Sequence, residues 1–348
     1  LRNVSIYILL RCSMAKATIY DVAREAGVSI ASVSRVLNTP DQVKPATRAR
    51  VLAAIDKLKF IPRQDAVARA RRGTGRIGIV TPSLTDDSFV ERLRGMFEAL
   101  TGMTYEAVIY LVTSSAQRDG ILTQLALMQP VDGIIVIGVA MNDEIIERFI
   151  ANDVPVVLFT DARSTLTCPI HQICVDHGAG AQIAADYLLE RGHRRLAYMG
   201  DMIPPDYSES LGRLKLDVFR QRLAEQGVSL PDAYVALAPQ NMEEARQQAH
   251  RLLDLPVPPT AIFASSDTQA IGVISAARER GLSIPEDLAV LGFDDITIAE
   301  FINLTTIRQE LKESGRTAVR MVTAAIESKD RQPEIVQMPL TLVVRNTV

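Results

Sequence analysis

The strongest constraint on this chain lies in residues 18–38, where two short helical patterns are separated by a single glycine. Apolar residues recur at helical spacing on both sides of the break: Ile19, Val22, Ala23 and Ala26 before it, and Val33, Val36 and Leu37 after it. Gly27 lets the chain leave the first helix with a positive φ, because glycine has no Cβ. Thr18 with Asp21 is typical of a capping pair, and Ser29 can cap the second helix. The spacing therefore predicts two short helices joined by a tight turn, a helix-turn-helix.

The second helix of such a motif enters the major groove of DNA. Its outward residues Ile30, Ala31, Ser34 and Arg35 are the candidate base readers. Ile30 and Ala31 are apolar, so they can select a sequence only through thymine methyl groups and close fit. Arg35 is suited to the backbone or to an outer base.

The charge of the chain is unevenly distributed. Residues 14–76 hold 13 Lys and Arg against 5 Asp and Glu, although the whole chain has a net charge of −3. A basic head joined to an acidic body suits a head that meets phosphates and a body that does not. A third helix is expected over 45–59, opened by Pro45 and carrying an apolar face of Val51, Leu52, Ile55, Leu58 and Phe60.

Longer motifs extend this pattern. TIYDVAREAGVS and SVSRVLN are followed by TRARVLAAIDKLKFIP, and later by GHRRLA at 192–197, Ser266-Asp267, GFDD at 292–295 and LTTI at 304–307. These motifs resemble those of the LacI/GalR family of bacterial transcriptional regulators, and the resemblance covers nearly all of the chain from Met14 onward. It implies an α/β protein with an N-terminal three-helix helix-turn-helix domain. A two-lobed, doubly wound parallel-sheet domain of the periplasmic-binding-protein-like kind is implied after it.

The resemblance also implies partners. It implies a homodimer that binds a palindromic double-stranded operator and a small-molecule effector, without a cofactor. The DNA-binding residues expected on this basis are Thr18, Tyr20, Ser29, Ile30, Ala31, Ser34, Arg35, Asn38, Arg69 and Arg71.

Residues 62–75, PRQDAVARARRGTG, form the expected hinge linker between the two domains. In the family this linker orders as a short helix when two copies lie on DNA, and a leucine wedges between base pairs in the minor groove. Here that position falls on Arg69 by one count and on Arg71 by another, and the linker contains no leucine. We expect these arginines to reach a narrow minor groove or the phosphates.

From residue 77 onward, strand patterns alternate with helical patterns. The strand runs are 77–80, 107–112, 133–137, 156–159, 196–199, 234–237, 261–264 and 288–291. The helical runs are 88–100, 117–128, 143–152, 178–191, 209–226, 242–253 and 269–280. Two similar halves meet near Asp176, which predicts two doubly wound lobes with a ligand in the crevice at the carboxyl ends of their strands. A helix over 310–327 and a strand over 335–344 are expected to return and cover both lobes.

The predicted domain limits follow from these segments. They are a disordered extension over 1–13, the helix-turn-helix domain over 14–61, the linker over 62–75 and an effector-binding and dimerisation domain over 76–348. Within the last, lobe 1 is expected over about 76–175 and lobe 2 over about 176–292, with the tail shared between them. Met14 is the expected native start, because the family pattern begins there at once.

The candidate effector-binding residues lie near predicted strand ends or match family positions: Phe89, Asp161, Arg213, Lys215, Asp267 and Asp294. Asp294 follows the strand LAVLGF and matches the family position that holds effector hydroxyls or amides; otherwise it caps the next turn. Asp267 can equally cap the helix after it. Phe89 can stack on a sugar face or belong to the core.

Two of these candidates depart from the family pattern. Asp161 lies one residue beyond the family's acid position, which falls on Thr160. Lys215 stands where the family commonly has an arginine, and it offers a point charge instead of a two-donor fork. Arg213 can substitute from a neighbouring turn.

Two motifs point to other chemistry. Residues 73–78, GTGRIG, match the glycine spacing of a dinucleotide fingerprint, but that fingerprint needs a strand before it and a helix opening within it. Cys168, His171, Cys174 and His177 have the residue types of a zinc site. In an extended chain, every third residue alternates faces, so these four would not converge without a loop. We expect neither a nucleotide cofactor nor a metal.

The remaining features limit the class of function. The chain has no Gly-x-Ser-x-Gly elbow and no Walker loop, so we do not expect an enzyme. Three cysteines fit a reducing cytoplasm, and no apolar run is long enough to cross a bilayer. We expect a cytoplasmic transcriptional repressor controlled by a sugar or a nucleoside. The alternative is a solute-binding protein of the same two-lobe fold, a class that needs an export signal and lacks a DNA-binding head.

Overall fold

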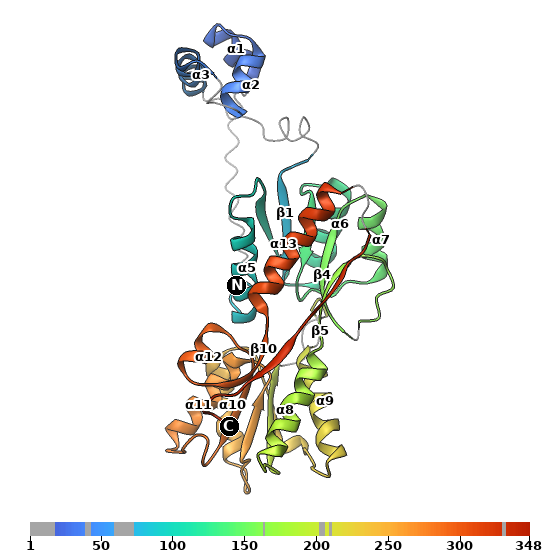
Figure 1. The fold of residues 1–348 in the computed structure, drawn as a ribbon, viewed down its shortest axis with the longest axis vertical. Helices are drawn as coiled ribbons and strands as arrows, with labels where there is room; N and C mark the ends of the chain where they lie inside the picture. Colours follow the sequence, from blue (N-terminus) through green and yellow to red (C-terminus); the bar gives the residue numbers. More distant parts are fainter. Residues whose placement is uncertain are drawn as a thin grey trace. The chain divides into compact units, whose positions relative to one another are not determined.

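The computed structural model describes residues 18–38, 43–58, 73–162, 164–201, 206–208, 211–328 and 332–348. The chain divides into two compact units, Leu1–Arg72 and Gly73–Val348 (Figure 1). The predicted extension over 1–13 and most of the predicted linker over 62–75 lie outside the described residues. Among the helices of the described residues, none is both long and apolar enough to cross a membrane.

The described part of the first unit forms the helices α1 (Ile19–Ala26), α2 (Ile30–Asn38) and α3 (Pro45–Leu58). The predicted capping pair at α1 is confirmed, because the Asp21 N–H donates to Thr18 Oγ1 at 3.4 Å and the Thr18 N–H donates to Asp21 Oδ2 at 2.9 Å. Gly27 ends α1 at a φ of 61°, as expected for a glycine cap. Ser29 Oγ accepts from the Ser32 N–H at 3.2 Å, so Ser29 caps α2.

These three helices share one small apolar cluster. Its buried members are Val22, Ala23, Ala26, Val33, Val36, Val51 and Ala54. The apolar face predicted for α3 is wrong at Leu52, which is 44% exposed, whereas Ala54 is buried. Leu52 lies about 100° around the helix from Val51, so it cannot share the face that Val51 presents to the cluster. Phe60 and the side chain of Leu37 lie outside the described residues.

The second unit consists of two lobes, each built on a six-stranded sheet. The sheet of lobe 1 is parallel throughout, in the order β11-β5-β4-β3-β1-β2. Its strands are β1 (Arg76–Thr81), β2 (Glu106–Leu111), β3 (Gly133–Val136), β4 (Val156–Asp161), β5 (His171–Val175) and β11 (Ile335–Met338). The sheet of lobe 2 has the order β12-β10-β9-β8-β6-β7, and only β12 is antiparallel to its neighbour. Its strands are β6 (Leu196–Asp201), β7 (Val235–Ala238), β8 (Ala261–Ala264), β9 (Ala289–Asp294), β10 (Thr305–Gln309) and β12 (Leu340–Val343).

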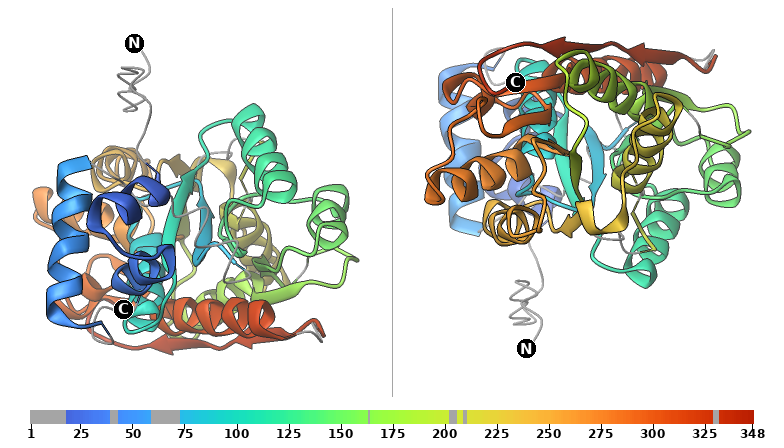
Figure 2. Two further views of the ribbon diagram at one scale, coloured as in Figure 1. Left: turned by 90° about the horizontal axis from the view of Figure 1, so that it is seen from above. Right: turned by 90° about the horizontal axis from the view of Figure 1, so that it is seen from below.

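Helices cover both faces of each sheet (Figure 2). In lobe 1, one face packs against α5 (Asp87–Leu100) and α13 (Leu311–Glu327), and the other against α6 (Ser115–Met128) and α7 (Asp143–Ala151). In lobe 2, one face packs against α8 (His177–Glu190) and α9 (Leu211–Glu225), and the other against α10 (Met242–Leu253) and α11 (Asp267–Glu279). The short helix α12 (Thr297–Phe301) and a 3₁₀ turn (Asp232–Tyr234) complete this lobe. The predicted pair of doubly wound lobes is confirmed.

The tail differs from its prediction. The single strand expected over 335–344 is interrupted at Pro339, and its two halves join different sheets as β11 and β12. Proline donates no ladder hydrogen bond, so it suits the point where the chain leaves one sheet for the other. Strands β5 and β10 were not among the predicted strand runs. The chain therefore crosses between the lobes three times, after β5, after β10 and after β11.

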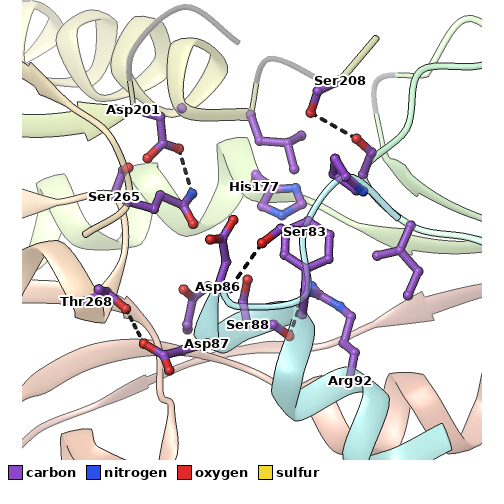
Figure 3. Close-up of a pocket in the computed structure, with 18 of the residues that line it drawn as sticks. Ser83, Asp86, Asp87, Ser88, Arg92, His177, Asp201, Ser208, Ser265 and Thr268 are labelled. Atoms are coloured by element: carbon purple, nitrogen blue, oxygen red, sulfur yellow. Dashed lines mark hydrogen bonds between the residues drawn. The ribbon is translucent and has the colours of Figure 1, made fainter. Parts of the chain in front are cut away.

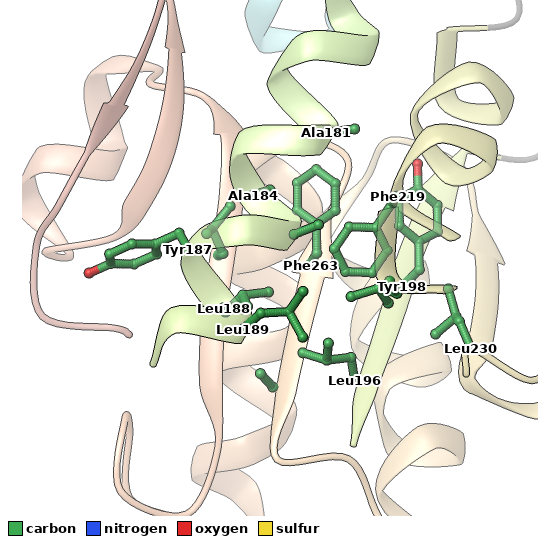
Figure 4. Packing of buried hydrophobic residues seen from close by; sticks show 14 of the residues in the cluster. Ala181, Ala184, Tyr187, Leu188, Leu189, Leu196, Tyr198, Phe219, Leu230 and Phe263 are labelled. Atoms are coloured by element: carbon green, nitrogen blue, oxygen red, sulfur yellow. The ribbon is translucent and has the colours of Figure 1, made fainter. Parts of the chain in front are cut away.

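Aromatic rings fill the core between the second sheet and helices α8 and α9 (Figure 4). The ring centroids of Phe219 and Phe263 are 5.0 Å apart, and those of Tyr198 and Phe263 are 5.6 Å apart. Tyr198 also donates its hydroxyl to the Gly212 carbonyl at 2.8 Å. This cluster fixes α9 against β6 and β8, and α9 carries a residue of the site described below.

Helices α5 and α13 pack most closely at two glycines. A Cβ added at Gly95 would overlap the backbone carbonyl of Lys312, and one added at Gly315 would overlap the carbonyl of Arg92. Gly120, in the middle of α6, has no atom within 4 Å of such a Cβ.

We expect Gly95→Ala to destabilise the protein by about 1–3 kcal/mol, because the two helices must move apart to admit the methyl group. Gly120→Ala is the matched control, and it should raise the stability by about 0.5–1 kcal/mol through its helix propensity. Urea denaturation measures both variants. Equal effects of the two substitutions would contradict the close packing of α5 and α13.

Candidate functional site

A cavity of about 850 Å³ lies between the two lobes (Figure 3). Many of its lining residues lie at or just beyond the carboxyl ends of β1 and of β3 to β10, so the strand ends of both sheets point toward it, and helices α5 and α9 contribute Arg92 and Lys215. The carboxyl ends of parallel strands are where open α/β sheets bind ligands. The size is that of a small-molecule site.

The lobes also contact one another around this cavity. Thr268 at the start of α11 donates its hydroxyl to Asp87 Oδ2 of α5 at 2.7 Å. On the side of residues 206–208, Ser208 Oγ donates to the Gly138 carbonyl at 2.9 Å, and the Ala140 N–H donates to the Tyr207 carbonyl at 3.0 Å. These hydrogen bonds hold the two lobes together across the cleft.

Lys215 of α9 lines the cavity and is only 4% exposed. Its Nζ donates to the Ser265 carbonyl at 2.5 Å and lies 4.3 Å from the centre of the Phe293 ring. Burial lowers the pKa of Lys215, while the nearby carboxylates of Asp201 and Asp294 raise it. The ammonium group is therefore held in an apolar setting by a carbonyl, a ring face and two carboxylates.

Three side chains joined by hydrogen bonds connect the two lobes beside the cavity. Arg92 of α5, 7% exposed, donates Nη2 to Gln309 Oε1 at 2.9 Å, and Gln309 Nε2 donates to Asp294 Oδ1 at 2.6 Å. Burial lowers the pKa of Arg92 to about 10, against the attraction of Asp294. Burial raises the pKa of Asp294 to about 6, against the charges of Lys215 and Arg92. Asp294 also has a positive φ of 119°, a strained conformation for a residue with a Cβ.

His177 begins α8 and lines the cavity. Asp161 Oδ2 accepts from the His177 N–H at 3.1 Å and lies 3.0 Å from Nδ1. Burial lowers the pKa of His177, which keeps the ring neutral, and the Asp161 carboxylate then selects the tautomer with a proton on Nδ1. The unprotonated Nε2 is left as a hydrogen-bond acceptor.

Two further carboxylates face the cavity from opposite lobes. Asp86 precedes α5 in lobe 1, and Asp201 ends β6 in lobe 2. Burial raises the pKa of Asp86, and the charges of Asp201 and Asp87 raise it further against a hydrogen bond from Ser83. Asp201 Oδ2 accepts from Gln240 Nε2 at 3.0 Å. When ionised, these two carboxylates offer only acceptors.

Three of the six predicted effector residues line the cavity, namely Phe89, Lys215 and Asp294. Phe89 is a partly buried side chain that also packs on the core of lobe 1. Thr160, the counted family position, lines the cavity, whereas the adjacent Asp161 instead holds His177.

The other two candidates, Asp267 and Arg213, do not line the cavity. Asp267 is fully buried beside the cavity lining, where Oδ1 accepts from Thr306 Oγ1 at 2.5 Å and Oδ2 from the Ile296 N–H at 2.9 Å. It therefore ties α11 to β10 and α12. Arg213 points into solvent and pairs with Asp217 at 3.0 Å, because its position on α9 is two residues from the one that faces inward.

Asp86, Arg92, His177 and Asp201 are among the lining residues that the sequence interpretation missed. Asp201 directly ends the run LAYMG and so carried the same strand-end signal as Asp294. Arg92 follows Phe89 by one helical turn, but only burial distinguishes it from the chain's other arginines. His177 was weighed only as a possible metal ligand.

The glycine motif at 73–78 and the Cys and His motif at 168–177 make contacts that stabilise the fold. The Asp132 carboxylate accepts from the N–H groups of Thr74 and Gly75, and the glycine run leads into β1 instead of opening a helix. Cys174 lies 3.2 Å from Thr160 Oγ1, and Cys168 contacts the Asp143 carbonyl. Across the described ranges, no group of three or more His, Cys, Asp or Glu side chains is arranged to hold a metal ion.

The first unit presents the second candidate surface. Tyr20 is 68% exposed and Ile30 41% exposed. Thr18, Ser29, Ala31 and Arg35 are also exposed, and Ser34 is half-buried. The side chain of Asn38 lies outside the described residues, as do Arg69 and Arg71.

The buried Asp294 carboxyl gives a pH-dependent stability. Its pKa in the folded protein, about 6, exceeds the ordinary value of 3.8, so folding favours the protonated form and stability is lost as pH rises from about 4 to 6. Asp294→Asn keeps the acceptor for Gln309 and removes the charge. We expect this variant to be more stable than the wild type at pH 7.5 by roughly 1–3 kcal/mol, and the gain to shrink below pH 5. Urea denaturation at both pH values measures this, and a gain that is independent of pH would contradict it.

Two family models match parts of this chain. The model for bacterial regulatory proteins of the lacI family matches residues 18–63, and the model for the periplasmic binding protein-like domain matches residues 185–348. Catabolite control protein A of Priestia megaterium is 30% identical over 332 residues, which are 95% of this chain and 98% of the relative. The HTH-type transcriptional repressor CytR of Escherichia coli K12 is 30% identical over 333 residues, 95% of this chain and 96% of the relative.

A solved structure extends the likeness to the whole fold. The Lac repressor bound to ONPG in the repressed state is 27% identical, with a TM-score of 0.76 over 96% of this chain and 100% of that one. Sequence and fold agree over both the helix-turn-helix unit and the two lobes. The chain therefore belongs to the lacI family of bacterial regulatory proteins.

Proposed function

We propose that this regulator represses transcription by binding a palindromic operator as a homodimer in the cytoplasm, under the control of a sugar or nucleoside in the interlobe cavity. The observation that carries the proposal is the cavity itself. It joins the carboxyl ends of two parallel sheets, and its buried donors and acceptors come from both lobes. A bound ligand would therefore change the free energy of closing the lobes.

The chemistry of the lining favours a ligand rich in hydroxyl groups. Hydroxyls donate to the carboxylate of Asp294 and to Nε2 of His177, and they accept from Lys215 and Arg92. Phe89 offers a ring for the apolar face of a sugar or a base. Asp161 and Asp267 act on this set indirectly, through His177 and through the α11 contact.

In the DNA-binding unit, α2 lies in the major groove in this proposal. Ile30, Ala31, Ser34 and Arg35 face the bases and phosphates, and Thr18, Tyr20, Ser29 and Asn38 hold the backbone. Arg69 and Arg71 of the linker reach the minor groove. Effector binding changes how the two linkers of a dimer approach one another and so shifts the population that holds an operator.

A solute-binding protein of the same two-lobe fold is the competing function. The helix-turn-helix unit has no use in such a protein, and the relatives above are transcriptional regulators. We also propose that the cavity binds its ligand without catalysing a reaction.

Arg35→Ala should weaken operator binding by about 1–3 kcal/mol, because it removes a cation from the exposed face of α2. Arg24→Ala is the matched control, since Arg24 is an exposed arginine on α1 that pairs with Asp21. Fluorescence anisotropy with genomic operator fragments at several salt concentrations compares them. If both variants lose the same affinity, α2 is not the reading helix.

A ligand of the cavity should change operator affinity and raise the melting temperature. Asp294→Ala should abolish both effects while leaving ligand-free operator binding intact, because Asp294 lies in the cavity and not in the DNA-binding unit. A thermal-shift screen of sugars and nucleosides, followed by anisotropy titrations, provides the measurement. A hit that binds the variant with undiminished affinity would place the effector elsewhere.

A further inference from the structure

The cavity holds an unbalanced set of charges. Among the described residues, four carboxylates line it, from Asp86, Asp87, Asp201 and Asp294, against the two cations Arg92 and Lys215. His177 is neutral, so it does not offset the difference. The lining therefore carries an excess of two negative charges.

Both cations act on Asp294. Arg92 reaches Asp294 through Gln309, and both Arg92 and Lys215 lower the pKa of Asp294. Asp87 has the Thr268 hydroxyl as a donor. Asp201 raises the pKa of Lys215 and is therefore partly compensated, whereas no cation is among the groups that shift the pKa of Asp86, so the uncompensated charge lies at Asp86, close enough to Asp201 of the other lobe to be repelled by it.

Both carboxylates keep acceptor capacity beyond the hydrogen bonds that Asp86 receives from Ser83 and Asp201 receives from Gln240. Asp86 stands at the N-cap position of α5, yet its side chain makes no capping hydrogen bond. Asp201 Oδ1 is shielded from solvent and has no hydrogen-bond partner among the described residues. Repulsion between the two is visible in Asp86, because the charge of Asp201 adds to burial in raising its pKa.

A second observation shows that the cavity requires a polar ligand. Arg92 is 93% buried and lines the cavity, and its Nε has no hydrogen-bond partner within the described part of the chain. A buried guanidinium donor left without an acceptor costs free energy until a ligand oxygen supplies one. A hydroxyl oxygen meets this need without adding a negative charge to a lining already in excess.

We propose that the effector is a hydroxylated compound with a protonated amine, and that its ammonium group binds between Asp86 of lobe 1 and Asp201 of lobe 2. This rests on the proposed function, because it names the chemical class bound at the same cavity. An ammonium has three N–H donors, enough to reach both carboxylates, and charge-assisted bonds of this kind are about twice as strong as neutral ones. Phosphorylated or carboxylated ligands are disfavoured at this end.

The position of the ammonium group between the two lobes couples effector binding to closure of the cleft. Since the two carboxylates belong to different lobes, they repel when the cleft is closed and empty. An ammonium between them turns this repulsion into attraction on both sides. The amine is therefore the part of the effector that selects the closed state, and the hydroxyl groups serve mainly Arg92, Lys215 and His177.

Isothermal titration with paired compounds tests the proposal. The pairs are hexosamines with their hexoses and N-acetylhexosamines, and aminodeoxynucleosides with their parent nucleosides. In at least one pair, we expect the charged member to bind the wild type at least about tenfold more tightly than its neutral partner. Asp86→Asn and Asp201→Asn should each reduce this preference to about twofold or less. Asp232→Asn, which removes an equal charge at an exposed position, should keep it.

Far-UV circular dichroism and urea denaturation of each variant verify that it is folded. If neutral or anionic compounds bind as tightly as the amines, or if both cavity variants keep the full preference, the amine proposal is overturned while the effector cavity stands. If no compound of either series binds a wild-type protein that does bind its operator, the cavity is not a sugar or nucleoside site, and both proposals are overturned.

Discussion

The interlobe cavity is lined by ionisable side chains that are held out of water with only part of their charge compensated. Moving a charged group from water into a protein costs several kcal/mol, which is recovered only through hydrogen bonds and opposite charges. Arg92, Lys215 and Asp294 recover part of it from one another and from Gln309 and the Ser265 carbonyl. The remainder is a free energy that a suitable ligand can release.

The path of the chain places these cavity residues at a crossing between the two lobes. Gln309 sits at the end of β10, immediately before the chain returns to lobe 1, and it contacts Arg92 on one side and Asp294 on the other. A change in how a ligand engages these groups therefore acts at a crossing between lobes. Helix α13 begins just after this point, and its backbone is in close contact with that of α5 at Gly95 and Gly315, so lobe 1 responds as a packed body.

Several features of this cavity lower the stability of the ligand-free protein. Asp294 has a strained backbone and a carboxyl that burial would keep protonated, and Asp86 is repelled by Asp201. Such features are costly to the free protein, and they cluster at functional sites in folded proteins. The lacI-family scaffold tolerates them because each lobe has its own large core, such as the aromatic cluster of Tyr198, Phe219 and Phe263.

The sequence alone determined what depends on neighbouring residues. The capping pair at Thr18, the glycine turn at Gly27 and the alternating strand and helix runs all follow from short-range spacing, so the helix-turn-helix and the two doubly wound lobes were predictable. Lys215 and Asp294 were predictable from motif position. Which side chains meet across the cleft depends on the tertiary structure. The split of the tail at Pro339, the burial of Arg92, the pairing of Asp161 with His177 and the opposition of Asp86 and Asp201 all join residues far apart in the chain. Desolvation and charge interactions depend on distance in space, which local sequence patterns do not encode.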